Sequence, residues 1–287
     1  MDESWTEGEI APRTKVNKNQ AIHGLSVIDD EVFIVTRDGS VIEVFDLNTF
    51  DFKRAFSVTG LVNPSDMVSC PKRKCLYICD WKKSADDTEI VCADKHGTVE
   101  TRWISENEKG RLSITKESHV IVAESWYNTI KEYSSHGQLI RRFVTGRQKL
   151  HLWHAIKLSN GNFVASFGDS QDDLQDVCIL DDQGQEMHSF TKTSAFPLNR
   201  PMAVPRTLAV DDFGNIYVAD LYNGRIIVLT SELQLKGVLN ATKAGYILMG
   251  PLRICLHELN DMRQLLVADS KKENKKWVNG KVLIIDI

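Results

Sequence analysis

Residues 208–229 constrain the fold of this chain most strongly, because they read as a complete β-meander. A first short apolar run leads into a turn that contains Gly214. A second run, residues 216–219, ends at Asp220 and continues through a turn at Gly224 into a third run. Short apolar runs separated by glycine-containing turns are typical of antiparallel strands joined by hairpins. The segment is therefore predicted to form three consecutive strands of one small sheet.

Weaker copies of the second strand of this meander recur along the whole chain. They are residues 32–36, 76–80, 120–124, 162–166 and 265–269. An anchor residue before each first strand marks the repeat, and the six anchors are His23, Asp66, Arg111, His154, Arg206 and Arg253. Successive anchors are 43, 45, 43, 52 and 47 residues apart. A period of about 40–50 residues with short strands is typical of propeller blades, and helical repeats would instead show long amphipathic helices.

The repeat therefore predicts an all-β fold, a six-bladed β-propeller of four-stranded antiparallel blades that forms one domain over residues 1–287. The last repeat stops at its third strand, residues 282–287, and lacks an outer strand. Residues 9–16 precede the first repeat and have no other assignment. We predict that this N-terminal segment completes the last blade, because pairing the two ends of the chain removes exposed strand edges.

The meander also carries a resemblance to a known family. Residues 208–229 resemble the NHL repeat consensus, and residues 18–287 resemble the NHL propellers of tripartite-motif-type proteins. Residues 153–158 and 256–259 are similar to segments of uncharacterised invertebrate NHL proteins. The resemblance implies a recognition surface for protein or RNA, with a minority of enzymes on related six-bladed folds. The sequence contains no RING, B-box or coiled-coil segment, so the resemblance does not imply ubiquitin-ligase activity.

The topology of such blades predicts where a functional site lies. The first strand of each blade lines the central channel, and the connections between blades share a face with the turns that follow the second strands. We therefore expect a site at one mouth of the channel. The candidate ligand-binding residues are the anchors His23, Asp66, Arg111, His154, Arg206 and Arg253, the second-strand ends Glu124, Asp220 and Asp269, and the flanking aromatic residues Trp81, Trp126, Trp153 and Tyr222.

The chemistry of these side chains suggests anion recognition. Arginine forks suit carboxylate or phosphate groups, and histidine can act as an acid or a base near neutral pH. A structural interpretation competes with this one, in which Asp220 pairs with Arg206 and Asp269 pairs with Arg253 to join turns. The aromatic residues can equally pack between blades.

Three functions remain open on the sequence alone. The first is a binding module for a protein segment or a small anionic ligand. The second is a metal-independent or metal-dependent enzyme with its active site at the same mouth, similar to the hydrolases, lyases and synthases on related six-bladed propellers. A metal-free reaction would use His23 or His154 as a base. The third is binding of single-stranded RNA through Arg111, Arg147, Lys149, Arg200, Arg206 and Arg253, which nearby acidic loop residues oppose. We expect no bound metal and no cofactor, because three arginine anchors repel a dication and His23 and His154 lie in opposite blades.

Composition narrows the partners further. The formal net charge is −4, which argues against an overall electrostatic surface for nucleic acid or an anionic membrane. No stretch approaches the roughly 18 apolar residues of a transmembrane helix, and residues 1–5 contain no apolar run of a secretory signal. We therefore expect a cytoplasmic protein without a membrane partner. We also expect a monomer, because a closed propeller needs no partner to complete its core.

Four of the cysteines, Cys70, Cys75, Cys79 and Cys92, fall within one short region, which suggests a zinc site. They lie inside apolar, strand-like runs, however, whereas zinc ligands are commonly presented by tight turns. We interpret them as buried free thiols in a reducing compartment, with a metal site or a disulfide as the alternative.

Overall fold

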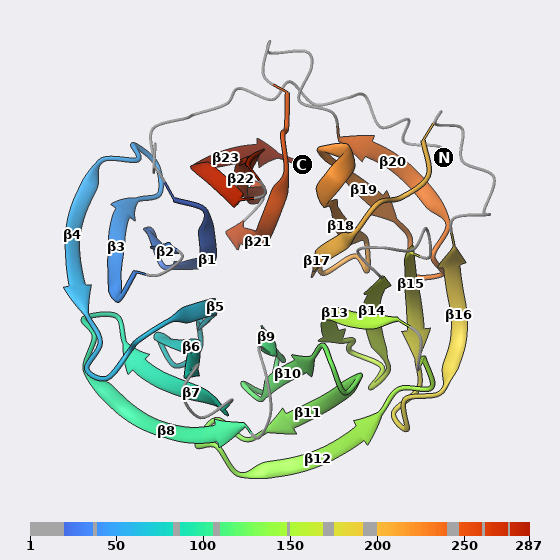
Figure 1. Cartoon of the computed structure of the whole chain (residues 1–287), viewed down its shortest axis with the longest axis horizontal. Coiled ribbons are helices and arrows are strands. Elements are labelled where there is room, and N and C mark those ends of the chain that lie inside the picture. The colour runs from blue at the N-terminus through green and yellow to red at the C-terminus, as the bar shows by residue number, and fades with distance from the viewer. Residues whose placement is uncertain are drawn as a thin grey trace.

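Six antiparallel β-sheets stand around a central axis, as the blades of a propeller do (Figure 1). The computed structural model describes residues 20–36, 39–82, 87–105, 110–147, 150–168, 175–191, 200–239, 247–259, 262–274 and 276–287. Over these residues, five sheets have four strands and the sixth has three. The predicted all-β, six-bladed propeller with antiparallel blades is therefore confirmed.

The strands follow one another in each blade from the central axis outward (Figure 1). Blade 1 contains β1 (Ile22–Ile28), β2 (Glu31–Thr36), β3 (Val41–Asp46) and β4 (Phe52–Ser57). Blade 2 contains β5 (Pro64–Cys70), β6 (Cys75–Lys82), β7 (Asp87–Asp94) and β8 (Val99–Ser105). Blade 3 contains β9 (Gly110–Ile114), β10 (Val120–Glu124), β11 (Thr129–Tyr133) and β12 (Leu139–Val144).

The second half of the chain repeats this order. Blade 4 contains β13 (His151–Lys157), β14 (Phe163–Gly168), β15 (Gln175–Leu180) and β16 (Glu186–Thr191). Blade 5 contains β17 (Pro205–Val210), β18 (Ile216–Asp220), the short 3-10 helix η1 (Leu221–Asn223), β19 (Arg225–Leu229) and β20 (Leu235–Leu239). Blade 6 contains β21 (Pro251–Leu259), β22 (Met262–Glu273) and β23 (Lys276–Asp286).

The core lies between neighbouring blades. Phe33 and Val35 on β2, for example, pack in one buried cluster with Leu76 and Ile78 on β6. Because both faces of a blade are covered in this way, the second strands are continuous apolar runs and do not alternate. The outer strands β4, β8 and β12 do alternate between exposed and half-buried residues, because only one of their faces is covered.

The turn that made the repeat visible in the sequence has a defined geometry. Gly214 adopts a φ of +83° and donates its N–H to the carbonyl of Asp211 at 3.0 Å. The Asp211 carboxylate in turn accepts the backbone N–H of Asn215 at 2.7 Å. Glycine is favoured because positive φ is costly for other residues. The same turn recurs at residues 94–97 and 181–184.

Closure of the ring involves blade 6 and the beginning of blade 1. The backbone N–H of Gly280 on β23 donates to the carbonyl of Gln20 at 3.2 Å, just before β1 begins. The predicted closing strand, residues 9–16, lies outside the described residues, so its place in blade 6 stays a prediction.

Candidate functional site

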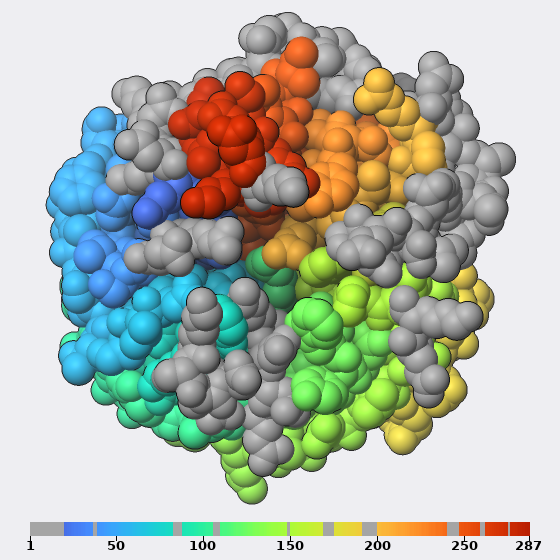
Figure 2. All heavy atoms as spheres, in the orientation of Figure 1, coloured from blue at the N-terminus to red at the C-terminus, as the bar shows by residue number. Residues whose placement is uncertain are grey.

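A cavity of about 390 Å³ opens on the central axis at the end where the innermost strands begin. The blades surround a hollow on this face of the molecule (Figure 2). Four of the six tryptophans of the chain line the cavity, namely Trp81, Trp126, Trp153 and Trp277. Arg111, Arg206 and His23 line it as well, and no carboxylate of the described residues does. Over the described residues, the lining of the cavity is therefore basic and aromatic.

β-Bulges in five of the six innermost strands place residues at this mouth. In β1, β5, β13, β17 and β21, one extra residue interrupts the ladder with the second strand. The bulge residues that line the cavity are His23, Ser65, Trp153, Arg206 and Leu252. Because a bulge re-aims the local side chain, one residue from each of these five blades turns toward the same space.

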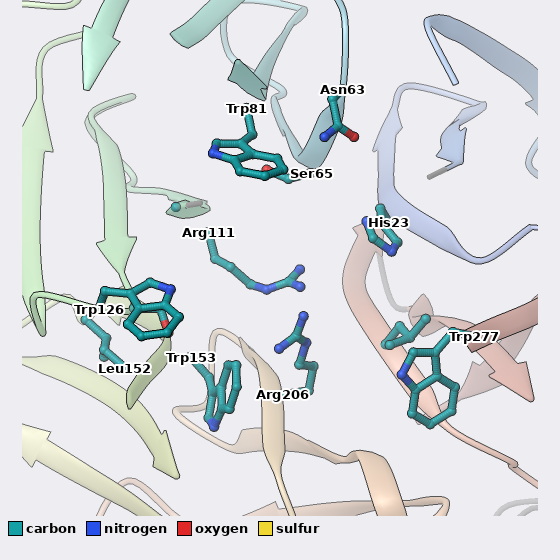
Figure 3. Close-up of a pocket in the computed structure, with 13 residues that line it drawn as sticks. His23, Asn63, Ser65, Trp81, Arg111, Trp126, Leu152, Trp153, Arg206 and Trp277 are labelled. Atoms are coloured by element: carbon teal, nitrogen blue, oxygen red, sulfur yellow. The ribbon is translucent and has the colours of Figure 1, made fainter. Parts of the chain in front are cut away.

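Arg111 enters the cavity from blade 3, where the strand pairing is regular and Arg111 lies opposite Ala123. Its guanidinium points to the middle of the cavity and faces that of Arg206 (Figure 3). The Arg206 guanidinium carbon is held 4.8 Å from the centroid of the Trp153 ring. Burial lowers the pKa of Arg111, and the attraction of Asp66 only partly offsets this effect. Two cationic groups therefore converge in a partly desolvated space.

The tryptophans stand around this arginine pair (Figure 3). Trp126 packs edge-on to His151, with ring centroids 5.1 Å apart. Trp277 stacks on Tyr222 with centroids 6.2 Å apart and an interplanar angle of 15°. Tyr222, a predicted site residue, is thus a support behind Trp277 and is not among the described lining residues. The aromatic walls are braced by contacts outside the cavity.

The anchors do not form the single ring that the sequence predicted. His154 and Arg253 lie deeper and line a second cavity of about 730 Å³, which is bounded by the far ends of the innermost strands. Asp66 is fully buried between the two levels, where its Oδ1 lies 3.2 Å from Arg253 Nε. The reason is the bulge, because Asp66, His154 and Arg253 each follow the bulge residue and are displaced inward by one position.

His154 is fully engaged in this interior network. Its Nδ1 accepts the backbone N–H of Leu208 at 3.2 Å, so the neutral ring carries its proton on Nε2, which donates to the Leu112 carbonyl at 3.1 Å. Burial, followed by the charge of Arg253, lowers the pKa of His154 well below its usual value. A role for His154 as a base at the mouth is therefore not supported.

The acidic ends of the second strands bind the backbone. Asp80 accepts the N–H of Asn63 at 2.6 Å, and Asp269 accepts that of Gly250 at 2.8 Å. Asp220 accepts the N–H of Ala203 at 2.7 Å. In three blades the carboxylate thus fixes the connection that leads into the innermost strand. Asp220 and Asp269 do not line the mouth cavity.

The ion pairs proposed for these residues from the sequence are corrected by the structure. Asp220 pairs with Arg225 at 2.7 Å, its direct cross-strand neighbour, and Arg253 pairs with Asp66. Arg206 instead packs on Trp153. Strand register, which the repeat alignment did not contain, decides these partners.

Glu124 is another predicted site residue that the structure places in the interior. Its Oε1 lies 2.7 Å from Lys131 Nζ and accepts the Ser105 hydroxyl at 3.1 Å. Burial raises the pKa of Glu124. Its carboxylate is therefore part of the blade and does not line the mouth cavity.

The proposed RNA contacts are also dispersed. Arg111 and Arg206 line the mouth, whereas Arg253 is buried near the axis. Arg147 forms ion pairs with Asp176 and Glu186, which neutralise it. Arg200 is exposed, and Lys149 lies outside the described residues.

Six lining residues of the mouth were predicted from the sequence, and others were not. His23, Arg111, Arg206, Trp81, Trp126 and Trp153 were predicted and meet there. Trp277 was not predicted, although a tryptophan is itself a signal for a binding site. It lies on β23, in the long hairpin that β22 and β23 form, opposite Lys272. Asn63, Ser65 and Leu252 carried no chemical signal of their own.

The described part of the chain contains no helical segment that could span a membrane. The six cysteines form no disulfide, and all except the half-buried Cys255 are buried, as predicted for Cys70, Cys75, Cys79 and Cys92.

Comparisons with known proteins extend to the fold alone. No protein-family model matches the chain, and no curated protein matches it. Hydrazine synthase of Kuenenia stuttgartiensis is similar over 90% of this chain and 78% of its own, with 14% identity and a TM-score of 0.60. A Bacteroides caccae protein of unknown function is similar over 79% and 84%, with 13% identity and a TM-score of 0.55.

A third similar structure is the PQQ-bound form of an aldose sugar dehydrogenase from Streptomyces coelicolor. It covers 96% of this chain and 97% of its own, with 11% identity and a TM-score of 0.63. The structural neighbours thus include enzymes and a protein of unknown function. At these identities they show that the chain is a β-propeller and indicate no specific activity.

Proposed function

We propose that this protein is a recognition module of the NHL type that binds an anionic group, a carboxylate or phosphate carried on a flat ring, in the mouth cavity. The observation that carries the proposal is the convergence of Arg111 and Arg206 in a cavity walled by four tryptophans (Figure 3). The ligand is either a small molecule or a peptide segment that presents such a group.

The arginine pair favours an anion for an electrostatic reason. Two guanidinium groups that face each other repel, and those of Arg111 and Arg206 face each other in the cavity (Figure 3). An anion between them replaces this repulsion with two charge-assisted contacts. Hydrogen bonds to charged groups contribute roughly 1.5–3 kcal/mol each. Binding energy is therefore available specifically to a negatively charged ligand.

The tryptophans favour a flat ring attached to that anion. Aromatic side chains provide apolar surface with a preferred stacking geometry, and they bury it without ordering many rotatable bonds. A volume of about 390 Å³ falls within the usual range for small-ligand pockets. The pocket therefore suits a compact ligand or the tip of a peptide more than an extended chain.

The enzyme and RNA alternatives receive less support. A metal-free reaction that uses His154 as its base is disfavoured, because both ring nitrogens are engaged away from the mouth. RNA binding requires a continuous basic track, and Arg147 and Arg253 are already paired with carboxylates.

A panel of flat anions tests the proposal by thermal stabilisation. Benzoate, indole-3-acetate, phenyl phosphate and pyrroloquinoline quinone, a flat polycarboxylate, are each added to the purified chain. A ligand that binds only the folded state raises Tm with its concentration. At least one aromatic anion is expected to raise Tm, with a smaller effect from acetate or inorganic phosphate.

Matched variants locate the effect. Arg206→Gln is expected to weaken binding about tenfold to a hundredfold, the equivalent of one charge-assisted contact. Arg142→Gln, on the exposed outer strand β12, is the control and is expected to bind as the wild type does. Equal binding by the wild type and Arg206→Gln would contradict the proposal.

A further inference from the structure

A second group of chemically reactive side chains lies far out in blade 2. The ligand atoms of Cys75 on β6, Cys92 on β7 and Glu100 on β8 all lie within 4.8 Å of one another. Cys92 Sγ is 3.6 Å from Glu100 Oε2. Three neighbouring strands thus bring two thiols and a carboxylate to one point.

Strand register explains why these residues meet. Cys92 on β7 lies directly opposite Tyr77 on β6, and Tyr77 is two residues beyond Cys75 on β6. The side chains of Cys75, Tyr77 and Cys92 therefore project from one face of the blade. Glu100 is the extra residue of a bulge between β7 and β8, since Val99 pairs with Ala93 and Thr101 with Cys92. The bulge turns the carboxylate toward the sulfurs.

We propose that Cys75, Cys92 and Glu100 bind a thiophilic divalent cation of the zinc class. Thiolate sulfur and carboxylate oxygen are ligands that zinc accepts in a tetrahedral set. Cys75 and Cys92 are fully buried, whereas 37% of the Glu100 side chain is exposed. The carboxylate therefore lies on the solvent side, where an ion enters.

The charges around the three residues balance a divalent ion. Arg73 Nη2 donates to Glu100 Oε2 at 2.8 Å, and Arg73 Nη1 is held by the Ser135 carbonyl at 2.6 Å. Two thiolates and a carboxylate carry three negative charges, and Arg73 supplies one positive charge. A divalent cation brings the group to neutrality, and Arg73 orients the carboxylate from outside the ligand set.

Cobalt(II) is the probe, because cobalt bound by thiolates absorbs in the near ultraviolet and tetrahedral cobalt absorbs in the visible. The full chain is reduced, stripped with a chelator and titrated. One equivalent of cobalt with a thiolate charge-transfer band is expected, and zinc is expected to displace it. A wild type without this band would overturn the proposal.

Variants assign the ligands. Cys75→Ser and Cys92→Ser are each expected to lower the charge-transfer absorbance at least twofold, because one of two sulfur ligands is lost. Cys178→Ser is the matched control, since this thiol is equally buried but lies on β15 in blade 4. An unchanged band in the Cys75→Ser/Cys92→Ser double variant would also overturn the proposal.

Glu100→Gln keeps the test decisive if the serine variants fail to fold. The side chain is partly exposed, so its amide is tolerated, and both thiols remain. Cobalt affinity is expected to fall at least about tenfold, the lower end of the loss seen when a supporting contact of a metal site is removed. Unchanged affinity would exclude Glu100 as a ligand and contradict the proposed site.

Discussion

Arg253 and Asp66 form an ion pair at the centre of the propeller, with 3.2 Å between Nε and Oδ1. The two residues come from blades 6 and 2 and are both buried. Arg253 also donates to the carbonyls of Met67 and Leu112, and Asp66 accepts the N–H of Leu112. The pair therefore ties together the innermost strands of three blades below the mouth cavity.

Removal of Arg253 is expected to destabilise the whole ring. In Arg253→Met, the Asp66 carboxylate stays buried without its partner, which costs about 3–5 kcal/mol of the free energy of unfolding. Urea denaturation measures this loss, with the exposed Arg142→Met as the control, for which a change within about 0.5 kcal/mol is expected. A loss below about 1 kcal/mol in Arg253→Met would show that the pair does not hold the centre.

Blades 1 and 2 approach closely at Gly24 on β1. A Cβ at this position would lie 2.6 Å from the Cβ of Met67 on β5. Gly24→Ala is therefore expected to lower the free energy of unfolding by about 1–3 kcal/mol through overpacking. Gly237→Ala on β20, where the added Cβ meets nothing within 4 Å, is the control. Equal stabilities of the two variants in urea denaturation would refute the close approach.

The neutral His154 makes stability depend on pH. Its folded pKa is depressed, so below the ordinary histidine value of about 6.5 the unfolded chain binds a proton that the folded chain does not. Stability from this group is therefore present above pH ~6.5 and decreases on acidification, by about 1.4 kcal/mol per pH unit. His154→Gln can keep both hydrogen bonds and does not titrate, so its denaturation midpoints between pH 6.5 and 5.5 should change less than those of the wild type. Parallel pH profiles would contradict this.

The Asp80 carboxylate supports the wall of the mouth cavity. It accepts the backbone N–H of Asn63 at 2.6 Å, and Asn63 lines the mouth. Asp80→Ala leaves this buried connection without its acceptor and is expected to cost about 1–3 kcal/mol in unfolding free energy. The exposed Asp182→Ala serves as the control in thermal denaturation. Equal Tm values would mean that the connection is held by other contacts.

The sequence predicted the propeller well because its signals are local. Apolar second strands recur in each blade, and the Asp211–Gly214 turn recurs at residues 94–97 and 181–184. Neither signal needs knowledge of distant contacts. The mouth was predicted in part for the same reason, since Trp81 and Trp126 closely follow second-strand ends and Trp153 directly precedes the anchor His154.

What the sequence could not supply was register. His23 and Arg206 are bulge residues and lie at the mouth, whereas His154 and Arg253 directly follow a bulge residue and lie in the interior. No residue type in the sequence predicts where such a bulge occurs. Strand register also places Arg225 directly opposite Asp220, so Arg225 is its ion-pair partner and Arg206 is not. The meeting of Cys75 and Cys92 with Glu100 depends on the same kind of local irregularity.

The most direct test of the proposed function compares a charged ligand with its neutral counterpart by isothermal titration calorimetry. Indole-3-acetate and indole-3-acetamide share a flat ring and differ in the carboxylate, and each is titrated into the wild type and Arg111→Gln. We expect the wild type to bind the acid about tenfold or more tightly than the amide, and Arg111→Gln to lose most of this preference. Equal affinities of the wild type for acid and amide, or an undiminished preference in Arg111→Gln, would contradict anion recognition by the arginine pair.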